Sequence, residues 1–269
     1  MWKYVIGTII AALVLYIYLI FPETRRKRKI WKYRGIQWAH RGLHENQAGI
    51  PENSMAAFRQ AVRAKMGIEL DVHLTRDKKL VVFHDDTLQR MCGVSGTVEE
   101  KTWEELKTLH LLDTAESIPL LEDVLHLING KVPILIEVKL LTEDTAICRF
   151  LVKELKSYSG QVLVQSFNSL VLRWLRKHEK QILRGQLSSD LVKSEKTPHY
   201  MFRFCVKYLL SNCICRPDFI SYKMEDSRNI SLWMQRHLFR VPVAAWTLHG
   251  DAMLQRAKSR FDMYIYEKN

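Results

Sequence analysis

The chain has 269 residues, of which 47% are apolar and 26% are charged, as expected for a globular protein. This length fits one large domain or two small ones, and the sequence contains no internal repeat. Residues 1–34 hold eight basic residues and one acidic residue, so they supply +7 of the net charge of +12. The remaining +5 makes the rest of the chain only mildly basic, which argues against nucleic acid as a partner.

The cysteine pattern points to unpaired thiols. The number of cysteines is odd, and their spacing fits neither a disulfide framework nor a zinc site. They are Cys92, Cys148, Cys205, Cys213 and Cys215. Unpaired thiols are typical of a reducing compartment.

The amino terminus carries an uncharged, apolar stretch of 19 residues, from position 4 to position 22. This length matches the hydrocarbon core of a bilayer, and the aromatic residues near both ends suit membrane interfaces. A cleaved signal peptide is the alternative, but it would have a shorter apolar core and a small-residue cleavage site. We therefore expect residues 1–24 to form a transmembrane anchor.

Residues 25–34 form a basic segment with seven Lys and Arg residues. The positive-inside rule predicts a single-pass protein of the cell membrane, with everything after residue 24 in the cytoplasm. The segment itself is predicted to be a juxtamembrane linker that lies against anionic head groups, at about 1 kcal/mol for each basic residue.

Polar motifs follow the first predicted strand of the remaining chain. Residues Ile36–Ala39 are predicted to form a short strand that ends at His40-Arg41-Gly42. After a loop, the apolar spacing that follows Pro51-Glu52-Asn53-Ser54 predicts a helix, with Asn53 or Ser54 as its N-cap.

The next predicted strand, Gly67–Val72, carries two carboxylates. Glu69 and Asp71 are two residues apart, so in a strand they face the same side. Buried together they would be costly without a positive partner, and a divalent cation with carboxylate ligands would supply one. The residues alone equally allow both side chains to be exposed, with the intervening apolar residues facing the core.

A third strand is predicted at Leu80–Phe83 and ends at His84-Asp85. Residues 75–79 are too few for a crossover between parallel strands, which needs about a dozen residues. We therefore predict an antiparallel hairpin that returns His84 to the end of the strand where Asp71 lies.

The segment 132–139 is a continuous apolar run, as in buried parallel strands, and it also ends in charged residues. Glu137 and Lys139 are again two residues apart. They add a third carboxylate, with a cation beside it, to the carboxylates of the earlier strand.

Together these motifs resemble the glycerophosphodiester phosphodiesterase family in order and approximate spacing. The resemblance covers roughly residues 35–267 and rests on His40-Arg41-Gly42, Pro51-Glu52-Asn53-Ser54, Ile68–Val72, Thr75-Arg76-Asp77, Val81–Asp85, Ile136–Lys139, Gln165–Asn168, Gly185–Leu187 and Ala245–Thr247. One departure is Tyr266-Glu267, which stands where the family usually has Thr-Asp.

The resemblance implies an α/β fold, the (β/α)₈ TIM barrel, over residues 35–269, with the hairpin as an excursion after the second strand. We expect the barrel strands to begin near Ile36, Ile68, Ile134, Val162, Ile182, Phe219, Val243 and Asp262. The active site of such a barrel lies at the carboxyl ends of its strands.

The resemblance also implies a reaction, the hydrolysis of a glycerophosphodiester to glycerol 3-phosphate and an alcohol. Its residues would be His40 and His84 as acid and base, in either order, Glu69, Asp71 and Glu137 as ligands of one Mg²⁺ or Ca²⁺, and Arg41, Lys139 and Trp246 around the substrate. Glu52 and Asn53 would organise the first loop or the outer metal shell, or act only as caps.

Several alternatives stay open. The anchor favours a lysophospholipase D that acts on lysolipids over an enzyme for water-soluble substrates. A non-catalytic binding barrel is a third hypothesis, and the intact His40, His84 and three carboxylates argue against it. A phospholipase C-like enzyme is a more distant alternative. Residues 192–217 are either a lid or a solvated helix and loop, and His249 is a possible substrate contact. The sequence indicates neither the head group nor the oligomeric state.

Overall fold

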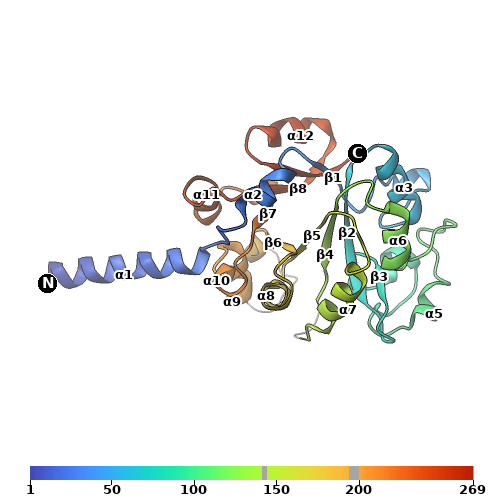
Figure 1. The fold of residues 1–269 in the computed structure, drawn as a ribbon, viewed down its shortest axis with the longest axis horizontal. Helices are drawn as coiled ribbons and strands as arrows, with labels where there is room; N and C mark the ends of the chain where they lie inside the picture. The colour runs from blue at the N-terminus through green and yellow to red at the C-terminus, as the bar shows by residue number, and fades with distance from the viewer. Residues whose placement is uncertain (141–143, 194–199, 269) are drawn as a thin grey trace.

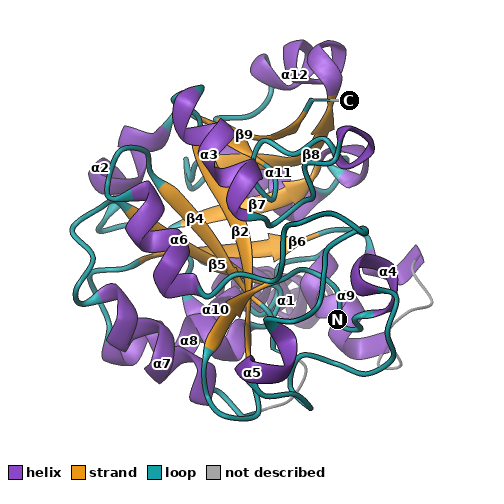
Figure 2. Ribbon diagram, turned by 90° about the vertical axis from the view of Figure 1, so that its right-hand side faces the viewer, coloured by secondary structure: helices purple, strands orange, loops and turns teal. Residues whose placement is uncertain are grey.

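A computed structural model describes residues 1–140, 144–193 and 200–268. Its centre is a closed barrel of eight parallel strands, in which β1 pairs with both β2 and β9 (Figures 1 and 2). The strands are β1 (Gln37–Ala39), β2 (Gly67–Leu74), β4 (Ile134–Val138), β5 (Val162–Ser166), β6 (Leu183–Ser188), β7 (Phe219–Lys223), β8 (Val243–His249) and β9 (Met263–Glu267). The predicted TIM barrel is confirmed, and each strand begins within one residue of its predicted start.

Strand β3 (Leu80–Val82) is the predicted hairpin excursion. It pairs antiparallel with the end of β2, where Val72 lies opposite Val82. Thr75 closes the turn, because its backbone N–H donates to the Lys79 carbonyl at 2.9 Å and its hydroxyl accepts from the Lys79 N–H at 2.8 Å. The hairpin places His84 directly after the last pairing with β2.

Helices cover the outside of the barrel. The helices of eight or more residues, α1 apart, are α3 (Met55–Arg63), α6 (Leu121–Ile128), α7 (Ala146–Leu155), α8 (Ser169–His178), α9 (Tyr200–Lys207), α11 (Ile230–His237) and α12 (Gly250–Lys258). Shorter turns are α4 (Gln89–Cys92), α5 (Trp103–Leu106) and α10 (Asn212–Cys215). Ser54 is the N-cap of α3, since its hydroxyl accepts from the Ala57 N–H at 3.1 Å.

The segment 192–217 is largely helical, with α9 and α10 between β6 and β7, and residues 194–199 lie outside the described part. The Tyr222 hydroxyl donates to the Lys207 carbonyl at 2.9 Å, which ties the end of α9 to the barrel. Phe202, on the outer part of α9, is 41% exposed.

The amino-terminal end of the barrel is closed by the segment that precedes β1. Helix α2 (Lys27–Ile30) and the turn Trp31–Tyr33 place Ile30 and Tyr33 in the same buried cluster as Trp38 and Phe219. The Arg26 Nε donates to Asp218 Oδ1 at 2.8 Å, just before β7. Part of the basic segment therefore pairs within the protein, in addition to its expected role beside a membrane.

Helix α1 (Trp2–Ile20) projects away from the barrel, at the left of Figure 1. It is the one helix in the described part of the chain that is long and apolar enough to cross a membrane. Ile20, at its end, is fully buried against the barrel, whereas residues 2–15 are exposed. The helix is therefore attached to the barrel by its last turns.

Candidate active site

The strand ends bring the predicted polar residues together at the carboxyl end of the barrel. Asp71 on β2 lies directly opposite Glu137 on β4 in the strand register. His40 follows β1, and the backbone N–H of His40 donates to the Tyr266 carbonyl of β9 at 2.9 Å. His84 follows β3, so side chains from positions 40 to 137 of the sequence meet at one opening.

The three carboxylates form a buried group. Oxygens of Glu69, Asp71 and Glu137 all lie within 4.8 Å of one another, and these residues are 2%, 1% and 7% exposed. The alternative in which Glu69 and Asp71 face solvent is therefore wrong. The Lys139 Nζ lies 2.6 Å from Glu137 Oε1 and 3.0 Å from Asp71 Oδ1.

The electrostatics of this group favour a bound cation. Burial and the neighbouring Asp71 and Glu137 carboxylates raise the pKa of Glu69 well above its ordinary value. Burial would also raise the pKa of Asp71, but Lys139, His84 and Arg41 together hold it below its usual range. Asp71 Oδ1 faces the Lys139 ammonium at 3.0 Å. Three buried carboxylates that converge in this way fit a hard divalent cation.

The first loop is organised around Arg41, which has a left-handed φ of 53°. Its backbone N–H donates to Glu69 Oε2 at 3.0 Å, and its Nη1 donates to Glu52 Oε1 at 2.7 Å. Asn53 Nδ2 donates to Asp71 Oδ2 at 2.9 Å. Because Ser54 is the cap, Asn53 and Glu52 are free to hold Arg41 and the acidic group in position.

A second ionic chain supports His84. The His84 Nδ1 lies 2.7 Å from Asp85 Oδ1, and Arg90 donates both to Asp85 and to Glu52. Burial opposes ionisation of Glu52, but its bonds to Arg90 and Arg41 lower its pKa to about 2. Arg90 could not be singled out from the sequence, because it lies on the short helix α4 outside the motifs.

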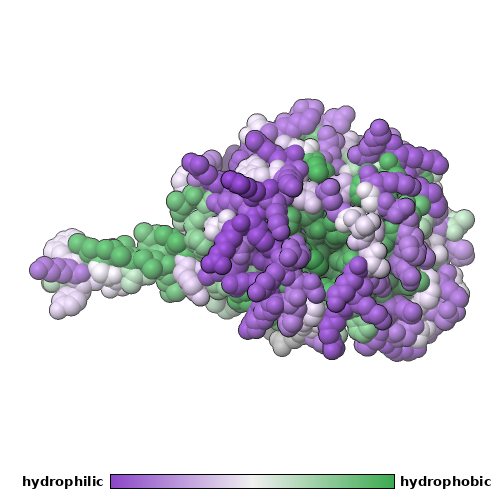
Figure 3. Space-filling model, viewed as in Figure 1, coloured by the Kyte–Doolittle hydropathy of each residue, from purple (hydrophilic) through white to green (hydrophobic). Residues whose placement is uncertain are grey.

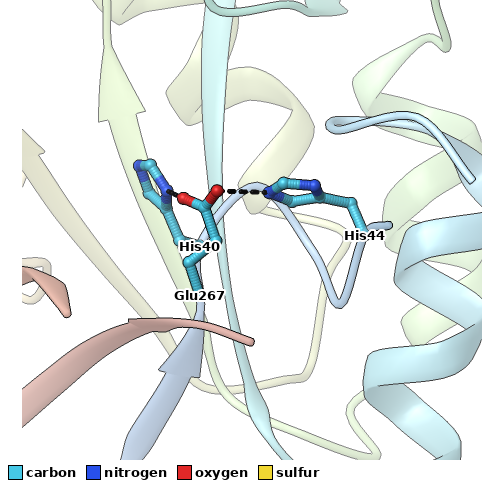
Figure 4. A group of neighbouring side chains, drawn as sticks. All are labelled: His40, His44 and Glu267. Atoms are coloured by element: carbon cyan, nitrogen blue, oxygen red, sulfur yellow. Dashed lines mark hydrogen bonds and ion pairs between the residues drawn. The ribbon is translucent and has the colours of Figure 1, made fainter. Parts of the chain in front are cut away.

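Glu267 links two histidines at the closure of the barrel (Figure 4). Its Oε2 lies 2.9 Å from His40 Nδ1, and its Oε1 lies 3.7 Å from His44 Nε2. Burial lowers the pKa of His40 to about 4, although the bond to Glu267 works in the opposite direction. His249 lies 3.9 Å from Glu267 and is half exposed, so it is at the edge of this group.

Glu267 occupies the position where the sequence departs from the family pattern. His44 carried no spacing signal, and neither of its ring nitrogens has a hydrogen-bond partner among the described residues. The signal that could have pointed to Glu267 is its place at the carboxyl end of the last strand, since closure puts that end beside β1.

A small cavity of about 80 Å³ opens at the centre of these groups. Its lining includes the predicted residues His40, Arg41, Glu69, His84, Glu137, Lys139 and Trp246, together with Gln165 and Phe167. A groove of about 280 Å³ adjoins it and shares Glu137, Lys139 and Phe167. The walls of this groove are mostly apolar and extend to Leu140, Leu191 and Phe202.

Comparison with known proteins identifies the family. The model of the glycerophosphoryl diester phosphodiesterase family matches residues 40–262. The chain belongs to this family. It is therefore a phosphoric diester hydrolase, as the resemblance implied.

Relatives of the phosphodiesterase extend from bacteria to mammals. It is 35% identical to a glycerophosphodiester phosphodiesterase of Bacillus altitudinis over 170 residues, which are 58% of this chain and 67% of that protein. It is 30% identical to a human lysophospholipase D over 190 residues, which are 65% of this chain and 53% of that protein.

The fold of this phosphodiesterase matches solved structures of the family. A phosphodiesterase of Oleispira antarctica, in complex with the product sn-glycerol-3-phosphate, superimposes with a TM-score of 0.71. The match covers 88% of this chain and 94% of that chain, at 20% sequence identity. At this identity the likeness supports the barrel fold.

Proposed function

We propose that the protein hydrolyses glycerophosphodiesters to glycerol 3-phosphate and an alcohol, with one divalent metal ion, at a membrane surface. The proposal is carried by the buried carboxylates Glu69, Asp71 and Glu137, which converge beside a cavity lined by His40 and His84. The names of bacterial relatives and the glycerol 3-phosphate bound to the Oleispira antarctica phosphodiesterase support the substrate class.

The substrate phosphodiester is anionic, so its developing charge must be neutralised. Mg²⁺ or Ca²⁺ held by the three carboxylates would supply that charge when bound. Arg41 and Lys139 would add donors to the phosphoryl oxygens, and an arginine suits bidentate contact with them. Trp246 meets Phe167 edge to face with ring centres 5.7 Å apart, and the pair forms an apolar wall for the glycerol moiety.

Two proton transfers are required, one from the attacking hydroxyl and one to the leaving oxygen. His40 and His84 each have Nδ1 tied to a carboxylate, Glu267 for one and Asp85 for the other. A carboxylate in this position fixes the orientation of the ring and leaves Nε2 to exchange a proton with the substrate. The two histidines are therefore positioned for the two transfers.

The test measures glycerol 3-phosphate released from glycerophosphocholine with Mg²⁺, with Ca²⁺ or with a chelator. His40→Ala and His84→Ala should each lower the rate by about 10² to 10⁴ while metal binding stays normal. Their effects should be non-additive if they act in one proton-transfer unit. Full activity of His84→Ala with metal bound would refute the two-histidine mechanism, and full activity in chelator would refute the metal site.

A second candidate substrate is a lysophospholipid, and the groove beside the cavity favours it. The groove joins the cavity at Phe167 and reaches Phe202 on α9, so it offers an apolar path for one acyl chain. Phe202→Asp should then lower choline release from lysophosphatidylcholine and leave glycerophosphocholine hydrolysis unchanged. Tyr200→Asp is the matched control, because Tyr200 is exposed on the same helix but does not line the groove. Equal effects on both substrates would exclude the acyl path.

We also propose that residues 1–24 anchor the enzyme in the cell membrane, with the barrel in the cytoplasm. The charge difference across α1 supports this orientation, because seven basic residues follow the helix and Lys3 alone precedes Tyr4. Cysteines introduced at position 2 and at position 269 can be treated with an impermeant thiol reagent in intact cells. Labelling above the background of the native cysteines is expected at position 2. Labelling at position 269 alone would show that the orientation is the opposite one.

A further inference from the structure

The last turns of α1 are held by buried polar side chains of the barrel. The Ile20 carbonyl accepts from Gln235 Nε2 at 2.6 Å and from Asn212 Nδ2 at 3.1 Å. The Tyr16 hydroxyl lies 2.6 Å from the Ser231 hydroxyl. We call this docked part, Tyr16–Ile20, the root of α1. Because Gln235, Asn212 and Ser231 are fully buried, the helix is attached firmly.

Docking shortens the part of α1 that is free to enter a membrane. Only Trp2–Leu15 stands clear of the barrel, and 14 residues of helix span about 21 Å at 1.5 Å for each residue. A bilayer has a hydrocarbon core of about 30 Å. If α1 crosses the bilayer, the free part is about 9 Å too short, so the root and the surface around it must approach or enter the acyl region.

The surface around the root carries exposed apolar and aromatic side chains, which suit a position at the boundary of the acyl region. Helices α10 and α11 flank the root in Figure 1, and the apolar colouring of α1 continues onto this flank in Figure 3. Ile230 and Trp233 on α11 are 58% and 55% exposed, and Ile214 on α10 is 39% exposed. Exposed tryptophan is favoured at the boundary between head groups and acyl chains.

A basic hollow of about 710 Å³ lies beside the root and α10. Tyr18 of α1 and Ile214 form part of its wall, and its basic side chains are Arg173, Arg176, Lys177 and Lys180. None of these four forms an ion pair with a carboxylate of the described residues. Four such cations beside a membrane helix suit the phosphate of an anionic lipid.

We propose that the face formed by α8, α10 and α11 around the root is a membrane-contacting surface that recognises anionic phospholipids. Ile214, Ile230 and Trp233 enter the boundary of the acyl region, and the basic hollow holds anionic head groups. The inference rests on the anchor proposed above but not on the hydrolytic reaction. The proposal determines which side of the barrel faces the bilayer. A flexible tether would not determine that side.

The first test measures which tryptophans reach the bilayer. The full-length protein is reconstituted in vesicles of phosphatidylcholine and phosphatidylglycerol with brominated acyl chains, which quench nearby tryptophan emission. Trp233→Phe and Trp2→Phe should each reduce the quenchable emission, whereas Trp103→Phe should not, because α5 lies at the opposite end of the molecule (Figure 1). If Trp2→Phe reduces it and Trp233→Phe does not, the surface is refuted while the anchor stands. If neither reduces it, both are refuted.

The second test concerns the basic hollow. Full-length protein released from nanodiscs of the same two lipids is analysed by native mass spectrometry for retained phosphatidylglycerol. Changing Arg173, Arg176, Lys177 and Lys180 to Gln should reduce the preference for phosphatidylglycerol at least about fivefold, the effect of a single basic residue near a membrane surface. The control changes Lys131, Arg149, Lys153 and Lys156 to Gln, which removes the same charge elsewhere. Equal retention by the two variants would overturn the headgroup assignment.

Discussion

Glu267→Gln tests whether the last strand of the barrel contributes to the chemistry through His40. The Glu267 carboxylate lies 2.9 Å from His40 Nδ1 and is itself mostly buried. The substitution keeps the size of the side chain but removes its charge. The pKa of His40, already lowered to about 4 by burial, should fall further because Glu267 works to raise it. The ring also loses the partner that fixes its orientation.

The magnitude follows from the bond that is lost. A hydrogen bond to a charged group contributes about 1.5 to 3 kcal/mol, so its loss should lower kcat by about 10- to 150-fold. The assay is the initial rate of glycerol 3-phosphate release from glycerophosphocholine at saturating metal. The metal concentration for half-maximal activity should not change, because Glu267 belongs to a different carboxylate group from Glu69, Asp71 and Glu137.

The controls distinguish an effect on the position of the His40 ring from a general effect on the structure. Glu267→Asp retains the charge and should recover part of the lost rate. His249→Asn should have little effect, since His249 is exposed and 3.9 Å from the carboxylate. In the His40→Ala variant, the further change Glu267→Gln should lower kcat very little. If the two changes were fully additive, or if Glu267→Gln kept the full kcat, Glu267 would not act through His40.

Three further predictions concern the metal site and stability. Glu69→Gln should raise the metal concentration for half-maximal activity at least about tenfold, and an unchanged metal titration would contradict the ligand assignment. The pKa of Glu52 is lowered from 4.5 to about 2, so its ionic bonds stabilise the fold above pH 4.5 and are lost as the pH falls toward 2. Because Arg90 is half exposed, Glu52→Gln should lower the free energy of unfolding by only about 1 to 2 kcal/mol at pH 7. Urea unfolding should show a smaller loss at pH 3, and an equal loss would argue against this ionisation. Gly185→Ala would place Cβ 2.2 Å from the Phe219 ring and should cost about 1 to 3 kcal/mol in the same assay, whereas a stable variant would mean that the ring moves freely.

The resemblance to the family implies the barrel, and local patterns in the sequence agree with its topology. Continuous apolar runs marked the buried parallel strands, and the short connection after Leu74 allowed only an antiparallel partner. The two-residue period of strands places Glu69 and Asp71 on one side of their strand but leaves open whether that side is buried. The resemblance to the family was needed to group them with Glu137 in one site.

The site residues that could not be predicted depend on contacts between positions far apart in the sequence. His40 and Glu267 are 227 residues apart and meet only because β9 closes the barrel against β1. Arg90 meets Glu52 from a turn that has no strand or helix periodicity to predict its direction. Similarly, the composition of residues 25–34 indicated a membrane-facing segment but not that Arg26 pairs with Asp218.

The two ends of the barrel differ in structure, and the proposed anchoring by α1 would orient both ends relative to a membrane. Ile30 and Tyr33 close the amino-terminal end, and the cavity of the candidate active site opens at the opposite end. The apolar groove leaves that cavity and reaches α9 at Phe202. The end of α9 adjoins α11, because the Lys207 carbonyl accepts from Asn229 Nδ2 at 3.0 Å. Since α11 also receives the root of α1, the proposed acyl path and the proposed membrane-contacting surface lie on neighbouring helices. A rigid anchor on this flank would hold the groove beside the bilayer, whereas an anchor on a long tether would not.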